Sequence, residues 1–195
     1  MPSPSRDAAP TASTEDPTQE LPPSQERVLS ENTPPFIVQA ACQSLFAAEL
    51  LKPSDEIWIF LPYVWNVQML DNRANLFRHV EPNWPQANIR IVSVLKKCAE
   101  EGSQIRILTT DARKNETFVD EVNALNVQAA SITVKQVSKW SNRPKLLATS
   151  RFSLRGGLSL SKKSGLTTTA AVRVSTEASI IASDLDECHT QWNAP

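Results

Sequence analysis

Apolar residues recur every three or four positions in four stretches of the chain, which is the pattern of a helix that buries one face. These stretches span residues 37–48, 91–99, 118–125 and 181–192. Pro53 predicts the end of the first helix, because proline cannot continue a helix, and Gly102 predicts the end of the second. The last stretch places Ile181, Leu185 and Trp192 along one side of a terminal helix.

Strands are predicted where apolar residues run without a break or alternate with polar ones. The segment 57–61 is predicted to be a central strand covered on both faces, and 104–108 is predicted to be a second strand. From Ser131 onward the pattern has a period of two, which predicts four short strands around residues 132–134, 146–147, 152–160 and 172–174. Residues 63–88 show no clear period and are expected to form a long loop with room for a helical turn. Loops of this length often carry function.

The order of these elements is helix, strand, helix, strand, helix, four strands and a last helix. Such an order predicts an α/β fold in which a mixed β-sheet is flanked by helices on both faces. Composition then divides the 195-residue chain at residue 35. Residues 1–35 hold 8 of the 14 prolines, no aromatic residue, and 2 basic against 6 acidic residues. We therefore expect a disordered, acidic, Pro/Ser/Thr-rich tail over 1–35 and one domain over 36–195.

The domain is mildly basic, with 18 basic against 15 acidic residues. Between Glu121 and Glu177 no acid occurs, while nine basic residues do. These are Lys135, Lys139, Arg143, Lys145, Arg151, Arg155, Lys162, Lys163 and Arg173. A stretch of one sign attracts anions such as phosphate or nucleic acid. The alternative is a solvated sheet face whose charges are neutralised in space by acids from elsewhere in the chain.

Several classes of protein are not expected. No apolar run approaches the roughly 18 residues of a membrane span, and no secretory signal is visible, so we expect a cytoplasmic protein with no membrane partner. Three cysteines without a C-x-x-C pair predict reduced, buried thiols. With four glycines, no phosphate-binding loop and no cluster of carboxylates, the sequence predicts neither a metal site nor a cofactor.

The segment from Arg143 to Ser161 resembles the phospholipase D superfamily, whose signature is H-x-K-x-x-x-x-D followed by G-S-x-N. Arg143 stands at the histidine position, Lys145 keeps the lysine, and Ser150 stands at the aspartate position. Gly156 keeps the glycine, and Ser159 replaces the asparagine. The serine position holds Gly157, and Ala171 falls near the position of a glutamate found in many members. The element order extends this resemblance over residues 36–195.

A second stretch, Leu61-Pro62-Tyr63-Val64-Trp65 followed by Leu70-Asp71-Asn72-Arg73, is similar to a branch of these proteins encoded with bacterial phage-defence and DNA-modification genes. The resemblance implies that two motif copies meet at a twofold axis, so that one histidine attacks phosphorus and the other protonates the leaving oxygen. One chain with one motif therefore implies a homodimer or pairing with a related subunit. A partner with an intact histidine would complete a working cleft.

The substitution at Arg143 removes that chemistry, because a guanidinium stays protonated and has no lone pair for attack. Ser150 lacks the charge that would orient an imidazole. The two histidines of the chain, His79 and His189, are each expected to be structural or solvated. The sequence thus predicts a pseudoenzyme with no intact catalytic residue, in which Arg143, Lys145, Ser150, Gly156 and Ser159 form a vestigial motif.

The retained positive charge favours binding over cleavage. Arg143 and Lys145 are two positions apart and are expected to share one face of a strand, facing the old cleft. An arginine can hold a phosphate with two hydrogen bonds and a lysine adds a point charge. We therefore expect Arg143, Lys145, Arg155 and Ser159 to bind phosphate. The alternative for Arg143 is that it fills the volume of the histidine and pairs with an acid.

Three functions remain open from the sequence. The first is a degenerate phospholipase-D-like protein that binds a phosphate-bearing polymer, with DNA as the first expectation, or serves as a subunit of a bacterial defence or DNA-processing complex. The second is an active phosphodiesterase or nuclease that works as a homodimer with another nucleophile. The third is an interaction protein whose acidic tail contacts a basic partner or shields the basic face.

Overall fold

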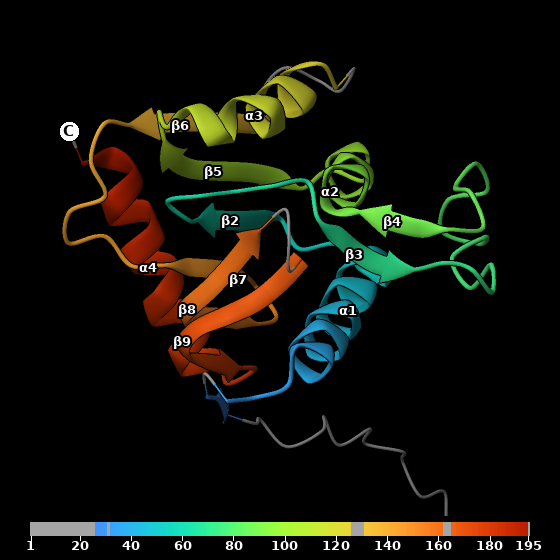
Figure 1. Ribbon diagram of the computed structural model, residues 1–195, viewed down its shortest axis with the longest axis horizontal. Coiled ribbons are helices and arrows are strands. Elements are labelled where there is room, and N and C mark those ends of the chain that lie inside the picture. Colours follow the sequence, from blue (N-terminus) through green and yellow to red (C-terminus); the bar gives the residue numbers. More distant parts are fainter. Residues whose placement is uncertain (1–25, 31, 126–130, 162–164, 195) are drawn as a thin grey trace, which may run out of the picture.

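A seven-stranded mixed sheet forms the centre of the computed structural model, which describes residues 26–194 apart from 31, 126–130 and 162–164 (Figure 1). The order across the sheet is β1, β9, β8, β7, β2, β5, β6. The strands are β1 Glu26–Leu29, β2 Glu56–Phe60, β5 Gln104–Thr110, β6 Ile132–Val137, β7 Leu146–Thr149, β8 Ser153–Ser161 and β9 Gly165–Ser175. A separate two-stranded sheet pairs β3 Gln68–Asp71 with β4 Asn88–Arg90.

The type of strand pairing changes once across the large sheet, from antiparallel to parallel at β2. β2, β5 and β6 run parallel, whereas β2, β7, β8, β9 and β1 each run antiparallel to their neighbour. The amino end of β7 therefore meets the carboxyl end of β2, and the Phe60–Leu146 pair marks that junction. At one end of the strands, the carboxyl ends of the three parallel strands β2, β5 and β6 therefore lie on the same side of the sheet as the start of β7.

Helices cover both faces of this sheet, which confirms the predicted fold class. The helices are α1 Pro35–Leu51, α2 Ile91–Glu100, α3 Glu116–Asn123 and α4 Ala178–Asn193. In Figure 1, α4 lies to the left of the sheet, while α1 and α2 lie to its right. Phe46 of α1, Leu95 of α2 and Phe118 of α3 share one hydrophobic cluster, whereas Cys188 of α4 belongs to a second.

The central strand β2 shows why two layers of helix are needed. Ile57 and Ile59 are fully buried in the cluster that contains α1 and α2, and Trp58 and Phe60 are buried in the cluster that contains α4. Alternate side chains of a strand point to opposite faces, so an unbroken apolar run is stable only between two covering layers. The sequence prediction for this segment is confirmed.

All three cysteines are free and buried, as predicted. Burial raises the pKa of the Cys42 thiol to about 12, and burial with the nearby charge of Glu49 raises the pKa of Cys98 to about 12. The thiols therefore remain protonated and act as small apolar side chains in the core.

Two predictions about element boundaries are wrong in part. Residues 26–29, assigned above to the disordered tail, form β1, whose four residues pair with Val172–Ser175 of β9. Backbone pairing to a free sheet edge needs little side-chain hydrophobicity, so tail-like composition does not exclude it. The long loop predicted over 63–88 contains β3 and ends at β4, two strands too short to show a period. The predicted disorder of residues 1–25 lies outside the described residues.

Candidate functional site

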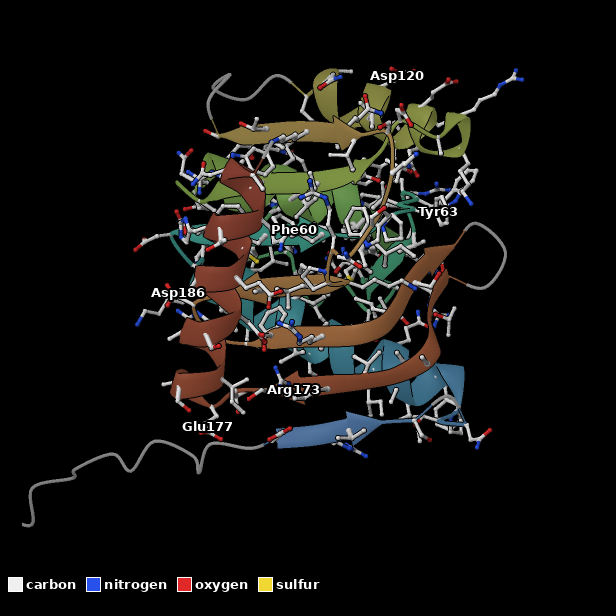
Figure 2. All side chains as sticks on the ribbon, turned by 90° about the vertical axis from the view of Figure 1, so that its left-hand side faces the viewer. Phe60, Tyr63, Asp120, Arg173, Glu177 and Asp186 are labelled. Atoms are coloured by element: carbon white, nitrogen blue, oxygen red, sulfur yellow. The ribbon has the colours of Figure 1, made fainter. Side chains whose placement is uncertain are left out.

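The end of the sheet where β2, β5 and β6 finish lies beside two of the predicted site residues, Arg143 and Lys145, and beside several exposed basic residues. The Asp111 N–H donates to the Val137 carbonyl, 3.1 Å away, which ties the chain after β5 to the end of β6. Figure 2 shows Tyr63 beyond the end of β2, which carries Phe60. We call the following residues the strand-end rim: Tyr63, Arg113, Lys114, Lys139, Arg143 and Lys145.

A buried asparagine fixes the backbone of this rim. Asn115 is fully buried in the 3-10 turn η1 (Arg113–Asn115), and its Nδ2 donates to the carbonyls of Pro62 and Thr110 at 3.0 and 2.8 Å. Its Oδ1 accepts from the Val64 N–H at 3.0 Å. Both neighbours of Tyr63 are therefore hydrogen-bonded to one side chain. Such a network in a buried position holds the loop in one conformation.

The exposed tyrosine of the rim carries a cation against its ring. The Nζ atom of Lys114 lies 2.9 Å from the centroid of the Tyr63 ring, a cation–π contact. Tyr63 nevertheless keeps 45% of its surface exposed. An accessible aromatic ring beside an ammonium is a combination that can bind an anion and an aromatic group together.

Arg143 lies before β7 and turns to the carboxyl end of α4. Its Nη1 donates to the Gln191 carbonyl at 3.1 Å and to Gln191 Oε1 at 3.3 Å. Lys135 does the same from β6, with its Nζ 2.9 Å from the carbonyls of Trp192 and Ala194. Cations stabilise the negative end of the helix dipole, and α4 has no basic residue in its own last turn. Arg143 thus donates to both carbonyl oxygens of Gln191.

Lys145 is half-buried at the junction between β2 and β7. Among the residues that the structure describes, its ammonium has no hydrogen bond or ion pair, while its carbonyl accepts from the Gly156 N–H at 3.0 Å. Gly156 has a φ of +123°, and a Cβ there would lie 2.3 Å from the Ala171 carbonyl oxygen. The glycine of the motif is therefore required by the backbone. Ser159 lies further along β8, half-buried and in register with Thr167.

Ser150 lies at the other end of β7. Its Oγ bonds to Ser54 Oγ at 2.8 Å, and Ser54 in turn bonds to the fully buried carboxylate of Glu49. Ser150 comes five residues after Lys145, with β7 between them, which corresponds to roughly 16 Å along a strand. The structure therefore brings Arg143, Lys145 and Gly156 to one end of the strand and does not bring Ser150 to them.

Arg155, predicted to bind phosphate, is already paired with acids. Its Nη1 lies 2.7 Å from Asp184 Oδ1 and 2.6 Å from Glu187 Oε2, and these partners raise its pKa despite burial. Arg173 also pairs with Asp184, at 3.2 Å. Asp184 is buried on the last helix, with only 2% of its surface exposed. It lies at helical spacing from Ile181 and Cys188, on the face that packs against the sheet.

The stretch that contains nine basic residues is thus neutralised in part by acids from elsewhere in the chain and left exposed in part. Acids from elsewhere pair with Arg155 and Arg173, and Glu49 lies 3.7 Å from Arg151. Helix carbonyls bind Lys135 and Arg143. Lys139 is exposed and Lys145 half-buried, whereas Lys162 and Lys163 lie outside the described residues. Two further basic residues at the rim, Arg113 and Lys114, lie outside the predicted site, and both are exposed after β5.

Neither histidine lies at the rim. His189 Nε2 is 3.0 Å from Glu56 Oε2, and its ring packs edge-on against Trp58 at 4.8 Å. Glu56 begins β2, so this pair occupies the end of the strand opposite the rim. His79 is exposed in the segment between β3 and β4, which projects from the far side of the sheet relative to α4 in Figure 1.

Other features of the described part of the chain add no second site. A pocket of about 550 Å³ lies between α1 and the residues after β3, lined by Ser44, Ala47, Leu70, Leu76 and Phe77 among others, on the face away from α4. Within residues 26–194 as described, no three His, Cys, Asp or Glu side chains are grouped as a metal would need. None of the described helices is both long and apolar enough to cross a membrane.

Comparison with known proteins rests on structure alone. No protein-family model matches the sequence, and no curated protein matches it either. Among solved structures, NucT from Helicobacter pylori matches at a TM-score of 0.51 and 10% identity, over 86% of this chain and 94% of that one. Polyphosphate kinase from Porphyromonas gingivalis matches at 0.55 and 11% identity, over 88% of this chain but only 26% of that one.

A third solved structure, the phospholipase D family member Nuc from Salmonella typhimurium, matches at a TM-score of 0.49 and 14% identity, over 87% of this chain and 93% of that one. At these identities the likeness concerns the fold alone. The two solved structures with TM-scores above 0.5 share the overall fold of this chain, and the predicted α/β fold is confirmed.

Proposed function

We propose that this chain is a phospholipase-D-like protein that binds nucleic acid through the strand-end rim and does not cleave it. The rim carries this proposal, because it combines five basic residues, which follow β5 and β6 or precede β7, with an exposed tyrosine whose ring Lys114 contacts. The same segments hold two exposed acids, Asp111 and Glu116, so the balance is positive. Exposed lysines and arginines provide the salt-dependent part of nucleic-acid binding.

The lack of cleavage follows from the presence of Arg143 at the position of the nucleophilic histidine. Arg143 has no lone pair to attack phosphorus, and its guanidinium donates to the carboxyl end of α4. His189 lies at the opposite end of β2, paired with Glu56. The motif is therefore degenerate in this proposal, and the active-phosphodiesterase alternative requires a nucleophile from a second subunit.

Binding across a salt series tests the proposal. Labelled single-stranded DNA, double-stranded DNA and RNA would be titrated with the full chain, with inorganic polyphosphate as a competitor that has phosphates but no bases. Lys145→Ala and Lys114→Ala are each expected to weaken binding and to reduce the slope of log affinity against log salt by about 1. Arg78→Ala, an exposed arginine between β3 and β4, is the matched control. Salt-independent affinity, or equal loss in the control, would argue against the rim.

Self-association is a second part of the proposal, and helix α1 favours it. α1 has no charged residue apart from the buried Glu49, and Phe36 and Leu51 are 70% and 76% exposed. Two copies can therefore bring this face together with no like charges opposed, as a twofold interface requires. Sedimentation of the Phe36→Glu/Leu51→Glu variant beside the parent chain tests this homodimer. Pairing with a related subunit in a defence or DNA-processing complex is the heteromeric form of the same proposal.

The acidic residues that precede β1 are proposed to shield the rim. Residues 1–25 carry four acidic side chains and one basic side chain, and a chain of that sign competes with phosphates for exposed lysines. Deletion of residues 1–25, which leaves β1 intact, is expected to tighten DNA binding at low salt and to have little effect at high salt. Unchanged affinity at low salt would contradict shielding.

A cytoplasmic location stays a prediction from the sequence.

A further inference from the structure

We infer that Tyr63 is a stacking platform for an unpaired base, so that the ligand of the rim is single-stranded nucleic acid. This inference rests on the proposed function and adds the class of ligand. Tyr63 is the one tyrosine of the chain, and it is one of the few large hydrophobic side chains that stay exposed. It stands at the edge of the sheet where the rim cations gather.

The position of Tyr63 is fixed before any ligand binds. Asn115 accepts from the Val64 N–H and donates to the Pro62 carbonyl, so both flanking peptide groups are held. The Thr110 hydroxyl also donates to the Pro62 carbonyl, at 2.7 Å. Val64 is fully buried, which anchors the loop in the core. An aromatic ring on a rigid loop loses little conformational entropy when a base stacks on it.

Lys114 covers one face of the Tyr63 ring and so determines which face a base can stack on. Its ammonium lies 2.9 Å from the ring centroid and covers one side of the ring, while 45% of the residue remains open. A base stacked on the open side would place its own phosphate within reach of the rim cations. The ring and the ammonium then contribute separately, the first through the base and the second through charge.

The stacking contact selects against duplexes. In a double helix every base face is already stacked on its neighbours, so a tyrosine gains a base only where the strand is unpaired. Phosphate contacts alone would accept both forms. The rim is therefore expected to bind a single strand more tightly than a duplex with the same number of phosphates. Both DNA and RNA present such bases, and parallel titrations with each would separate them.

The test compares Tyr63→Ala with Tyr63→Phe on four ligands: an oligothymidine, the matching oligouridine, a duplex of equal phosphate number, and inorganic polyphosphate. Tyr63→Ala is expected to weaken binding of the single strands about tenfold and to leave polyphosphate binding within about twofold, with an unchanged salt slope. Tyr63→Phe keeps the ring and is expected to bind like the parent. Lys114→Gln is expected to reduce the salt slope for all four ligands.

The outcomes separate this inference from the proposed function. Equal weakening by Tyr63→Ala on polyphosphate and on single strands, or duplex binding as tight as single-strand binding, would overturn the stacking role while leaving nucleic-acid binding by the rim intact. No salt-sensitive binding of any ligand by the parent chain would overturn both. Thermal unfolding of each variant, with an unchanged midpoint, shows that a loss of binding reflects the removed ring.

Discussion

The Nη1 atom of Arg143 donates a hydrogen bond to the main-chain carbonyl of Gln191, 3.1 Å away, at the carboxyl end of α4. The position that aligns with the catalytic histidine of the phospholipase D signature therefore connects the β6–β7 segment to the last helix. Trp140 supports the same contact, because its Nε1 donates to the Arg143 carbonyl at 3.1 Å. A residue used in this way contributes to stability and to positive charge at the rim, and it offers no nucleophile.

Replacing Arg143 by alanine is expected to lower the free energy of unfolding by about 1.5 kcal/mol, because hydrogen bonds between a charged donor and helix carbonyls are lost. Urea unfolding measures this change. Lys139→Ala, an exposed cation of the same segment, is the control and is expected to have little effect. A loss in the control as large as that of Arg143→Ala would show that the segment tolerates no change, whatever the contact.

Asp184 is expected to be among the most sensitive acids of the last helix. Asp184→Asn leaves Arg155 and Arg173 without their shared carboxylate. Each arginine side chain is about one third exposed, so solvent offsets part of the loss, and we expect a cost of about 2 kcal/mol. Asp186→Asn, at an exposed position two residues away, should be close to neutral. Differential scanning calorimetry of both variants checks the contrast, and equal melting temperatures would contradict it.

Acid is expected to loosen the contact between α4 and the sheet through Glu56. Burial raises the pKa of Glu56, but hydrogen bonds from Arg106 and Trp58 and the charges of His189 and Arg106 outweigh burial and hold it below the ordinary 4.5. A lowered folded-state pKa stabilises the fold above the unfolded-state value, and this stabilisation is lost as the pH falls below 4.5 and through the folded-state pKa. Glu56→Gln should therefore unfold with a shallower pH dependence below that value, measured by tryptophan fluorescence in urea. If the stability of Glu56→Gln fell as steeply with acid as that of the parent chain, Glu56 would not be responsible for the loss of stability.

The cysteines are expected to resist alkylation in the folded protein. Since burial raises the pKa of Cys42 and Cys98 to about 12, almost no thiolate exists at about pH 8 and no reagent reaches the sulfur. Iodoacetamide labelling followed by mass spectrometry should show three modified cysteines only after unfolding in guanidinium. Rapid modification of the native chain would mean that the core opens on that timescale.

The sequence was a good guide where burial is periodic. The helix at residues 91–100, the strand after it and the apolar run 57–61 were all predicted, because each buries a regular set of side chains. β3 and β4 were missed, since strands of four and three residues carry no readable period. β1 was missed because three of its four residues are exposed and the strand is held largely by backbone hydrogen bonds, which leave no mark in composition.

The site was predictable only where its residues belong to one local motif. The motif placed Lys145 and Gly156 together, as the structure does. The role of Asn115 in holding the Tyr63 loop was not predictable. Its partners Pro62 and Val64 are more than fifty positions away, and their main-chain atoms make the contacts. Lys114 was predictable from position alone, since it follows a parallel strand at the edge where the neighbouring strands also end. The pairing of Asp184 with Arg155 depends on how α4 crosses the sheet, which no local pattern gives.

The central claim is that the rim binds nucleic acid without hydrolysing it. The most direct measurement follows binding and integrity of one labelled single-stranded oligonucleotide on the same purified full-length chain, across a salt series. We expect the affinity to fall steeply with salt and to depend on Lys145 and Tyr63, and we expect the oligonucleotide to stay intact after prolonged incubation. Turnover that persists through repurification, and that is lost in His189→Ala or His79→Ala, would contradict it.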